Sequence, residues 1–471
     1  MQAGLPERQG DEAPSRVVPL IVATALLMEN IDATVLATSL PQIAADLGAS
    51  PIHLKLALTS YLLALAVFIP ASGWMADRFG ARHIFRLAIV LFAAGSIACA
   101  LSDTLGELIA ARVLQGVGGS MMVPVGRLIV LRSTAKADLV GALAWLTVPA
   151  LIGPVIGPPL GGFITTFFDW RWIFWINIPI AVVGFVLVSL LIPDVEIEDV
   201  PPFDLGGFLL LGPGLAATLT GVTLAGVGLA PPAVVIGMTA GGILLLAGYV
   251  RHAGRREEPI VDLRLLHLPT FRINATGGTL FRVGTGALPF LLPLMLQLGF
   301  GLSAFESGML TLATGVGALG MKFIAPPILR RFGFRRVLVV NAAFAALFLL
   351  APAAFTPTTP WAVMLAVLLL GGLSRSLQFT SVNAVAYADV EPEKLSSATS
   401  FNSVLQQLSG SVGITVAAFG LEGMQWVTGR EGIDLAMFPP VFLLVALVSA
   451  AGILPFLRLP RDAGAGLLGG R

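Results

Sequence analysis

Charged residues are scarce in this chain. Of its 471 residues only 12% are Asp, Glu, Lys or Arg, whereas 56% are hydrophobic, and the mean hydropathy is +0.90. A soluble domain cannot bury that much apolar surface, and many apolar runs are long enough to span a bilayer. The alternating ten-residue segments of a transmembrane β-barrel do not occur. The composition therefore predicts an all-α polytopic membrane protein.

Cysteine and histidine are almost absent. The single cysteine, Cys99, lies in an apolar run, which excludes an internal disulfide framework and favours a small core residue. The four histidines are scattered through loops and span ends without the spacing of a metal site. No nucleophile and base fall together in a pattern typical of catalysis. We therefore predict no enzyme activity, no catalytic residues, no metal and no cofactor, and the net charge of +1 gives no reason to expect a nucleic-acid partner.

Fourteen apolar segments reach spanning length, and prolines punctuate the linkers between them. The first segment is too long for a signal peptide and carries Glu29 and Asp32, so we interpret it as a span. Most basic linker residues fall on the side of the N-terminus, which predicts that both termini are cytoplasmic. The predicted spans cover residues 17–38, 52–73, 84–102, 106–128, 138–165, 172–192, 204–225, 231–250, 273–297, 305–329, 337–356, 360–386, 396–421 and 434–458.

A short polar loop is predicted between the second and third spans, at residues 72–85. It concentrates charge in a chain that has little, and its glycines are expected to permit tight turns. Its notable residues are Gly73, Asp77, Arg78, Gly80 and Arg82. The loop recurs later in the chain, because residues 329–336 align with residues 76–83, and Arg330 stands where the first copy has Asp77.

An internal repeat of this length implies two related halves, which is one way in which transporters are built. The two copies join spans two to three and spans ten to eleven. We therefore predict a six-helix bundle over residues 1–195, a two-helix insert over 196–255 and a second six-helix bundle over 256–471. The segment 255–272 mixes arginine with apolar residues, which leaves open whether it lies along the inner membrane interface or is a solvated linker.

Ionisable residues inside the predicted spans are candidates for function, because a charge at bilayer depth costs at least ~2.5–3.5 kcal/mol on insertion scales. Glu29 and Asp32 are three residues apart and share one face of the first span. Arg112 in the fourth span lies at a depth that matches Asp32. Such a pair is either a proton-handling site, in which burial and the arginine oppose each other, or a static ion pair that fixes helix packing.

The later spans carry cations with almost no acid nearby. Arg282, Lys322 and Arg375 fall within the ninth, tenth and twelfth predicted spans. Lys322 is close enough to the inner interface to reach it by snorkelling, whereas Arg282 and Arg375 lie deeper. We interpret these three residues as candidates for a substrate cavity.

Small residues mark one face of the fifth span. Gly153, Gly157 and Gly161 recur at every fourth position, and prolines between them bend the helix. The spacing predicts a smooth surface against which another helix packs closely. Helix packing without any role in transport explains this spacing equally well.

Together these motifs resemble the major facilitator superfamily, in its fourteen-span drug–proton antiporter branch. The similar stretches are residues 73–82 for the family's loop signature, 31–41 for the first span, 112–119 for the fourth-span arginine motif, 153–162 for the fifth-span antiporter motif and 170–179 for a motif of the fourteen-span branch. The antiporter motif comprises Gly153, Pro154, Gly157, Pro158, Gly161 and Gly162. Similarity extends over essentially the whole chain and resembles the bacterial MdtD-type efflux proteins.

The resemblance implies a major facilitator fold of two six-helix bundles plus a two-helix insert. It also implies a protein that exports multidrug-type small molecules from the bacterial inner membrane in exchange for protons by alternating access. Nothing in the sequence demands more than a monomer. It implies that Asp32 and Arg112 approach each other beside a central cavity, with Asp32 as the main proton carrier and Glu29 as a helper or a substrate contact. Loop 72–85 would then be a gate. Its Asp77 is expected against the start of the thirteenth span, near Ser396, when the inner side is shut.

The substrate class stays open at this point. The excess of buried cations predicts an anionic or zwitterionic compound, such as an organic acid, a metabolite or a metal chelate. The family resemblance favours lipophilic cationic drugs instead. A channel or a membrane-embedded sensor is the alternative from another class. Repeated halves and coupled acids argue against a channel, and the lack of a soluble output domain argues against a sensor.

Overall fold

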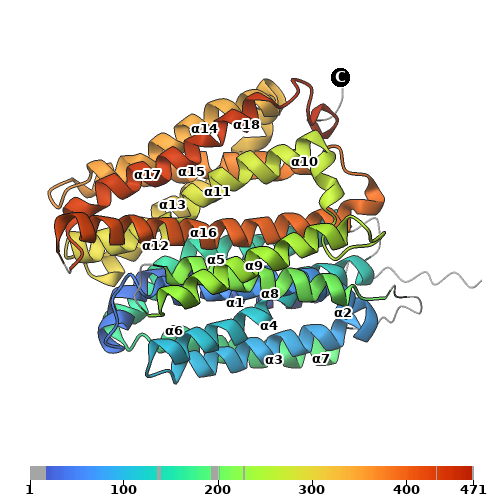
Figure 1. Cartoon of the computed structure of the whole chain (residues 1–471), viewed down its shortest axis with the longest axis horizontal. Coiled ribbons are helices and arrows are strands. Elements are labelled where there is room, and N and C mark those ends of the chain that lie inside the picture. The colour runs from blue at the N-terminus through green and yellow to red at the C-terminus, as the bar shows by residue number, and fades with distance from the viewer. Residues whose placement is uncertain are drawn as a thin grey trace, which may run out of the picture.

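The computed structural model describes residues 17–134, 139–192, 200, 202–225, 229–430 and 432–468. Every regular element in these residues is a helix, and Figure 1 shows the long helices lying side by side. Thirteen helical runs within the described residues are long and apolar enough to cross a membrane. The α5 helix, Leu139–Phe167, is 29 residues long and contains the further apolar stretch Ile152–Phe167. The predicted all-α fold with about fourteen transmembrane helices is therefore confirmed.

The first six spans form what we call the N-terminal half. Its helices are α1 Val17–Asp46, α2 Lys55–Phe79, α3 Ala81–Ala100, α4 Leu105–Ser133, α5, and the pair α6 Trp172–Trp175 and α7 Asn177–Leu191. Within this half α1 packs on α5, and both α2 and α3 pack on α4. The predicted boundary at residue 195 lies outside the described residues.

Two further spans, α8 Leu205–Leu224 and α9 Pro232–Ala253, pack on each other, and α8 also packs on α2. Figure 1 shows both helices, in green, on the near face of the molecule. The linker that follows contains a short 3-10 helix, η1 Leu263–His267, and is not fully solvated. Its Leu265 and Phe271 are buried in one apolar cluster with Ala398 of α16.

The last six spans form what we call the C-terminal half. The first of them is a nearly continuous run of α10 Pro269–Ile273, η2 Asn274–Gly278, α11 Thr279–Gly286, α12 Leu288–Leu294 and η3 Met295–Gly299. The others are α13 Ala304–Phe332, α14 Phe334–Leu350 with η4 Ala351–Ala354, α15 Trp361–Ala386, η5 Pro392–Lys394 with α16 Leu395–Thr428, and η6 Leu435–Met437 with α17 Phe438–Ala451 and α18 Ile453–Leu457. A final 3-10 helix, η7, spans Ala465–Leu468. The two halves meet mainly where α5 packs on α13 and α2 packs on α16.

The loop predicted at residues 72–85 is much shorter than expected. Helix α2 continues to Phe79 and α3 begins at Ala81, so Gly80 alone separates them. Gly80 has a φ of 84°, a backbone conformation that costs glycine little, and Gly333 makes the same kind of turn between α13 and α14 with a φ of 73°. The repeated sequence thus builds the same turn twice. The turn expected at Gly73 is wrong, because the polar residues at the membrane edge continue the helix.

The glycines of α5 bring two helices into close contact with it. A Cβ atom added to Gly157 would collide with Thr34 of α1, and one added to Gly161 would collide with the carbonyl oxygen of Val35. The face that meets the C-terminal half is equally tight, since a Cβ on Gly162 would strike the backbone of Ala304 at the start of α13. Close helix packing, predicted from the spacing, is present on α5.

Candidate functional site

A polar network lies buried in the N-terminal half. Asp32 of α1 accepts hydrogen bonds from Arg112 Nη1 at 2.6 Å and Gln115 Nε2 at 2.8 Å, both on α4, and from Asn177 Nδ2 of α7 at 3.0 Å. Ser96 of α3 accepts from Gln115 Nε2 at 2.8 Å and from Asn177 Nδ2 at 3.2 Å. All five side chains are buried. The predicted approach of Asp32 to Arg112 is therefore present as a hydrogen-bonded ion pair.

Close helix packing positions this network. A Cβ added to Gly95 of α3 would collide with Gln115 of α4, and one added to Gly118 of α4 would collide with Phe92 of α3. The two helices therefore approach closely enough for α3 to reach the polar side chains of α4. A capping box formed by Thr104 and Glu107 fixes where α4 begins.

Aromatic rings enclose Arg112 on its other sides. Its guanidinium carbon lies 4.2 Å from the ring centroid of Tyr61 and 6.0 Å from that of Phe174, within the range of cation–π contacts. Arg112 is only 1% exposed and also donates to Gln115 Oε1 at 2.5 Å. Asp32 thus accepts hydrogen bonds from three side chains, one of them the charged guanidinium of Arg112.

Glu29 lies one turn before Asp32 on α1 but in a different environment. It is 8% exposed, its Oε2 atom is buried without a hydrogen-bond partner, and it forms no ion pair with any residue that the structure describes. The hydroxyl oxygen of Tyr61 is also buried without a partner. An ionised carboxylate in such surroundings carries a large desolvation cost, which the protonated form avoids.

Sequence reasoning missed three members of the network, Ser96, Gln115 and Asn177. Gln115 and Asn177 lie inside the stretches 112–119 and 170–179 that carry the family resemblance. An amide side chain in an apolar helix was the available signal, because a buried amide needs partners for its donors and acceptor.

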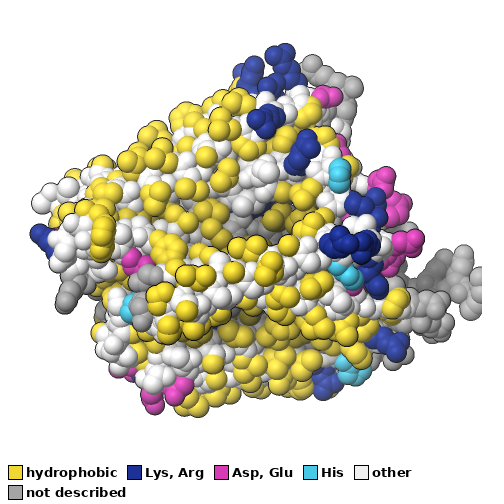
Figure 2. Space-filling view, in the orientation of Figure 1, with side chains coloured by type: hydrophobic (Ala, Val, Ile, Leu, Met, Phe, Trp, Pro, Cys, Tyr) yellow, Lys and Arg dark blue, Asp and Glu magenta, His cyan; other side chains and the backbone are white. Residues whose placement is uncertain are grey.

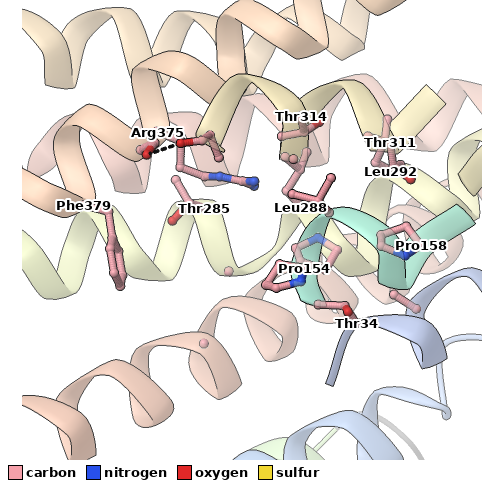
Figure 3. A pocket seen from close by; sticks show the side chains of 18 of the residues that line it. Thr34, Pro154, Pro158, Thr285, Leu288, Leu292, Thr311, Thr314, Arg375 and Phe379 are labelled. Atoms are coloured by element: carbon pink, nitrogen blue, oxygen red, sulfur yellow. Dashed lines mark hydrogen bonds between the residues drawn. The ribbon is translucent and has the colours of Figure 1, made fainter. Parts of the chain in front are cut away.

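A cavity of about 510 Å³ lies between the two halves. Its wall on the N-terminal side comes from α1 and α5, and the opposite wall comes from α11, α12, α13, α15 and α16. Figure 3 shows Thr34, Pro154 and Pro158 on one side of this space and Thr285 and Arg375 on the other. Residues of the antiporter motif therefore form part of the cavity wall, whereas Glu29 and Asp32 do not line it.

The cavity is lined by three cations and no acid. Arg282, Lys322 and Arg375, predicted from sequence as cavity candidates, all line it. Lys322 Nζ donates to Thr380 Oγ1 at 2.9 Å, and none of the three cations has an acidic partner among the described residues. One aromatic side chain, Phe379, is part of the lining. The space is thus positively charged and offers little aromatic surface.

Arg282 is the most buried of the three cations, at 4% exposure. Its Nη2 atom donates to the side-chain oxygens of Asn274 at 2.9 Å, Asn383 at 3.0 Å and Asn402 at 3.3 Å. Its Nε and Nη1 atoms are buried without any partner. Arg282 forms no ion pair with Glu29 or with any other acid that the structure describes, and amide oxygens leave its positive charge unneutralised.

An ion pair and two hydrogen bonds join the two halves at the end of the bundle that lies away from the C-terminus. Lys55 Nζ of α2 contacts Glu422 Oε1 of α16 at 2.7 Å. Gln297 Nε2 donates to the backbone oxygen of Thr38 at 2.9 Å, and the backbone N–H of Phe305 donates to Thr166 Oγ1 at 3.0 Å. These contacts join the two halves at this end, so the structure represents a state closed there.

The gate-loop residues form contacts within their own half. Asp77 pairs with Arg132 of α4, and Arg82 donates to the backbone oxygen of Ser189 in α7. Arg78 is exposed. Asp77 has no contact with Ser396 here. That contact was predicted for the state that is closed at the opposite end, so it remains a prediction.

Comparison with known proteins identifies the family to which this chain belongs. The family profile described as Major Facilitator Superfamily matches residues 22–414 and 274–468. The chain is 40% identical over 447 residues to a protein of Salmonella heidelberg (strain SL476), and 40% identical over 445 residues to proteins of Shigella boydii serotype 4 (strain Sb227) and Escherichia coli (strain K12 / DH10B). Each comparison covers 94% of both chains, and all three relatives bear the name multidrug resistance protein MdtD.

Solved structures share the fold at low identity. A D-xylose–proton symporter matches with a TM-score of 0.69 and 15% identity, covering 95% of this chain and 98% of that one. An auto-inhibited POT family peptide transporter matches with a TM-score of 0.70 and 17% identity, covering 94% and 96%. The human organic anion transporter MFSD10 (TETRAN) matches with a TM-score of 0.60 and 15% identity, covering 94% and 100%.

Fold and site therefore define a multi-pass membrane transporter and not an enzyme. The chain belongs to the major facilitator superfamily, and its relatives are of the MdtD type.

Proposed function

We propose that this transporter exports small molecules across the bacterial inner membrane in exchange for protons, as a monomer with both termini in the cytoplasm. The observation that carries the proposal is the cavity between two halves that an ion pair and two hydrogen bonds join at the end away from the C-terminus. Alternating access requires such a space and ties that can break. The names of the MdtD relatives support an efflux role.

Proton coupling is assigned to the buried acids of α1 and to Arg112. From sequence we expected Asp32 to be the main carrier. Asp32 accepts three hydrogen bonds and pairs with Arg112, whereas Glu29 has no partner, and as an ionised group it would be buried without a counter-charge. We therefore propose that Glu29 holds the proton in this conformation, and that Asp32 and Arg112 link its release to helix movement.

A second candidate concerns the substrate. The unneutralised Arg282, Lys322 and Arg375 favour an anionic or zwitterionic compound over a lipophilic cation. Buried cations are expensive without a counter-charge, and a bound anion would supply it. The single lining aromatic, Phe379, gives a cation few cation–π contacts. Multidrug export of cations remains the competing assignment, on the strength of the relatives' names.

Two probes of matched shape and opposite charge test the substrate class. Binding of tetraphenylborate and tetraphenylphosphonium to the purified protein is measured for the wild type, Arg282→Ala, Arg375→Ala and the control Arg430→Ala. Arg430 follows α16, pairs with Asp434 and is not part of the cavity lining. We expect tetraphenylborate to bind more tightly than tetraphenylphosphonium, and each cavity variant to lose about tenfold or more, since removing a buried charge partner costs more than 1.4 kcal/mol. Cation binding that survives both cavity substitutions, without anion binding, would refute the anionic assignment.

Proton coupling is tested in everted vesicles, where the substrate that binds should accumulate and should be lost on addition of a protonophore. Accumulation that ignores the protonophore would contradict the proposed exchange.

A further inference from the structure

The second copy of the repeated turn carries charge that the described part of the chain does not neutralise. In the first copy, Asp77 pairs with Arg132. In the second copy Arg330 replaces the acid. The charged residues on both sides of the turn at Gly333 are all basic, namely Arg330, Arg331, Arg335 and Arg336. None of these four forms an ion pair with a residue that the structure describes.

A second cavity, of about 590 Å³, opens beside this turn. Arg335 and Arg336 of α14 and Arg461, which follows α18, line it together with apolar residues that include Val340 and Leu457. Arg335 Nη2 donates to the backbone oxygen of Leu457 at 2.8 Å, which joins α14 to α18 and holds one guanidinium at the wall. No acidic residue is part of the lining. Figure 2 shows Lys and Arg side chains gathered at this end of the molecule, near the C-terminus.

The position of the cavity matches the boundary between acyl chains and headgroups of a bilayer. One apolar span begins at Phe334 and another ends at Leu457, so the arginines sit at the ends of two spans. Val340 and Leu457 are 50% and 46% exposed, and Val340 lies further into its span than the arginines of α14. A ligand that fits this cavity needs negative charge at one end and hydrocarbon at the other.

We propose that this cavity binds an anionic phospholipid, with Arg336 and Arg461 on its phosphate and the apolar wall against its first acyl carbons. Guanidinium groups match phosphate geometry, and basic pockets between transmembrane helices are suited to anionic headgroups. A soluble phosphate would satisfy the arginines but leave the apolar wall uncovered. Binding links α14 to the segment after α18, independently of the central cavity and of its substrate.

The test measures affinity for phosphatidylglycerol in detergent, with phosphatidylcholine as the uncharged competitor. Each exposed arginine near a membrane surface contributes about fivefold to anionic lipid binding, so Arg336→Gln with Arg461→Gln should weaken phosphatidylglycerol binding about 25-fold. The matched control is Arg251→Gln with Arg255→Gln, which removes the same charge from exposed positions at the end of α9. We expect less than a twofold effect there.

A conservative variant separates charge from folding. Arg336→Lys with Arg461→Lys keeps the charge and removes only the guanidinium geometry, so it should lose less affinity than the glutamine variant. The proposal is overturned if the wild type does not prefer phosphatidylglycerol to phosphatidylcholine, or if the control variant loses as much affinity as the cavity variant. It is also overturned if millimolar glycerol 3-phosphate displaces the lipid, because the site would then belong to a soluble phosphate compound.

Discussion

Glu29→Gln and Asp32→Asn should separate proton coupling from stability. Gln at position 29 mimics a permanently protonated Glu29 and places no new charge in the protein. Since Glu29 has no hydrogen bond to lose, we expect the free energy of unfolding to change by less than about 1 kcal/mol. Asp32→Asn removes the counter-charge of Arg112, which is 1% exposed. Breaking a buried ion pair in this way costs about 3–5 kcal/mol.

The assay compares two readouts for each variant. Thermal unfolding in detergent reports stability, and uptake into everted vesicles driven by a pH gradient reports coupling. For Glu29→Gln we expect wild-type stability, intact substrate binding and no pH-driven uptake. For Asp32→Asn we expect a large loss of stability. If Glu29→Gln takes up substrate as the wild type does, while a stably folded Asp32→Asn does not, Asp32 is the carrier and the assignment of Glu29 fails.

The other predictions concern the gate, the interface of α1 with α5, and the tie between the halves. Asp77→Asn should slow turnover without unfolding the protein, because it weakens closure at the end that bears the termini; unchanged transport would contradict this role. Gly161→Ala should cost about 1–3 kcal/mol of stability through overpacking against Val35, whereas Gly237→Ala, which meets open space, should cost nothing; equal melting temperatures would show that α1 and α5 do not pack as described. Glu422→Gln should weaken the contact between α2 and α16 because it removes the ion pair with Lys55. Distances between spin labels on α2 and α16 measure this, and an unchanged distance distribution would show that the ion pair does not hold the halves together.

The fold was largely predictable from the sequence because hydropathy and charge locate the spans directly. Helix ends were not, since hydropathy stops at the bilayer while α2 continues to Phe79 and α1 continues to Asp46. The turns at Gly80 and Gly333 followed from the repeat, because the same residues meet the same steric requirement. The turn expected at Gly73 shows the limit of predicting turns from glycine, because a glycine permits a turn but does not require one.

The site was predictable where it rests on charge. The contact of Asp32 with Arg112 was predicted because the two residues lie at the same depth in their spans. Arg282 was predicted as a cavity residue because a charge inside a span is energetically costly. The tie between Lys55 and Glu422 was not predictable, because the two residues are 367 positions apart and each lies near a helix end, where a charge is unremarkable in sequence. The conformational state, closed at one end, also depends on such long-range contacts.

Substrate-induced proton movement tests the central claim most directly. Everted vesicles are energised until a pH-sensitive dye inside them is quenched, and the tighter-binding probe is then added to wild type, Glu29→Gln and Arg375→Ala. Exchange predicts that the probe restores fluorescence in the wild type and in neither variant. Restoration of equal size in all three, or none in the wild type despite accumulation of the probe, would contradict a proton exchanger that works through Glu29 and the central cavity.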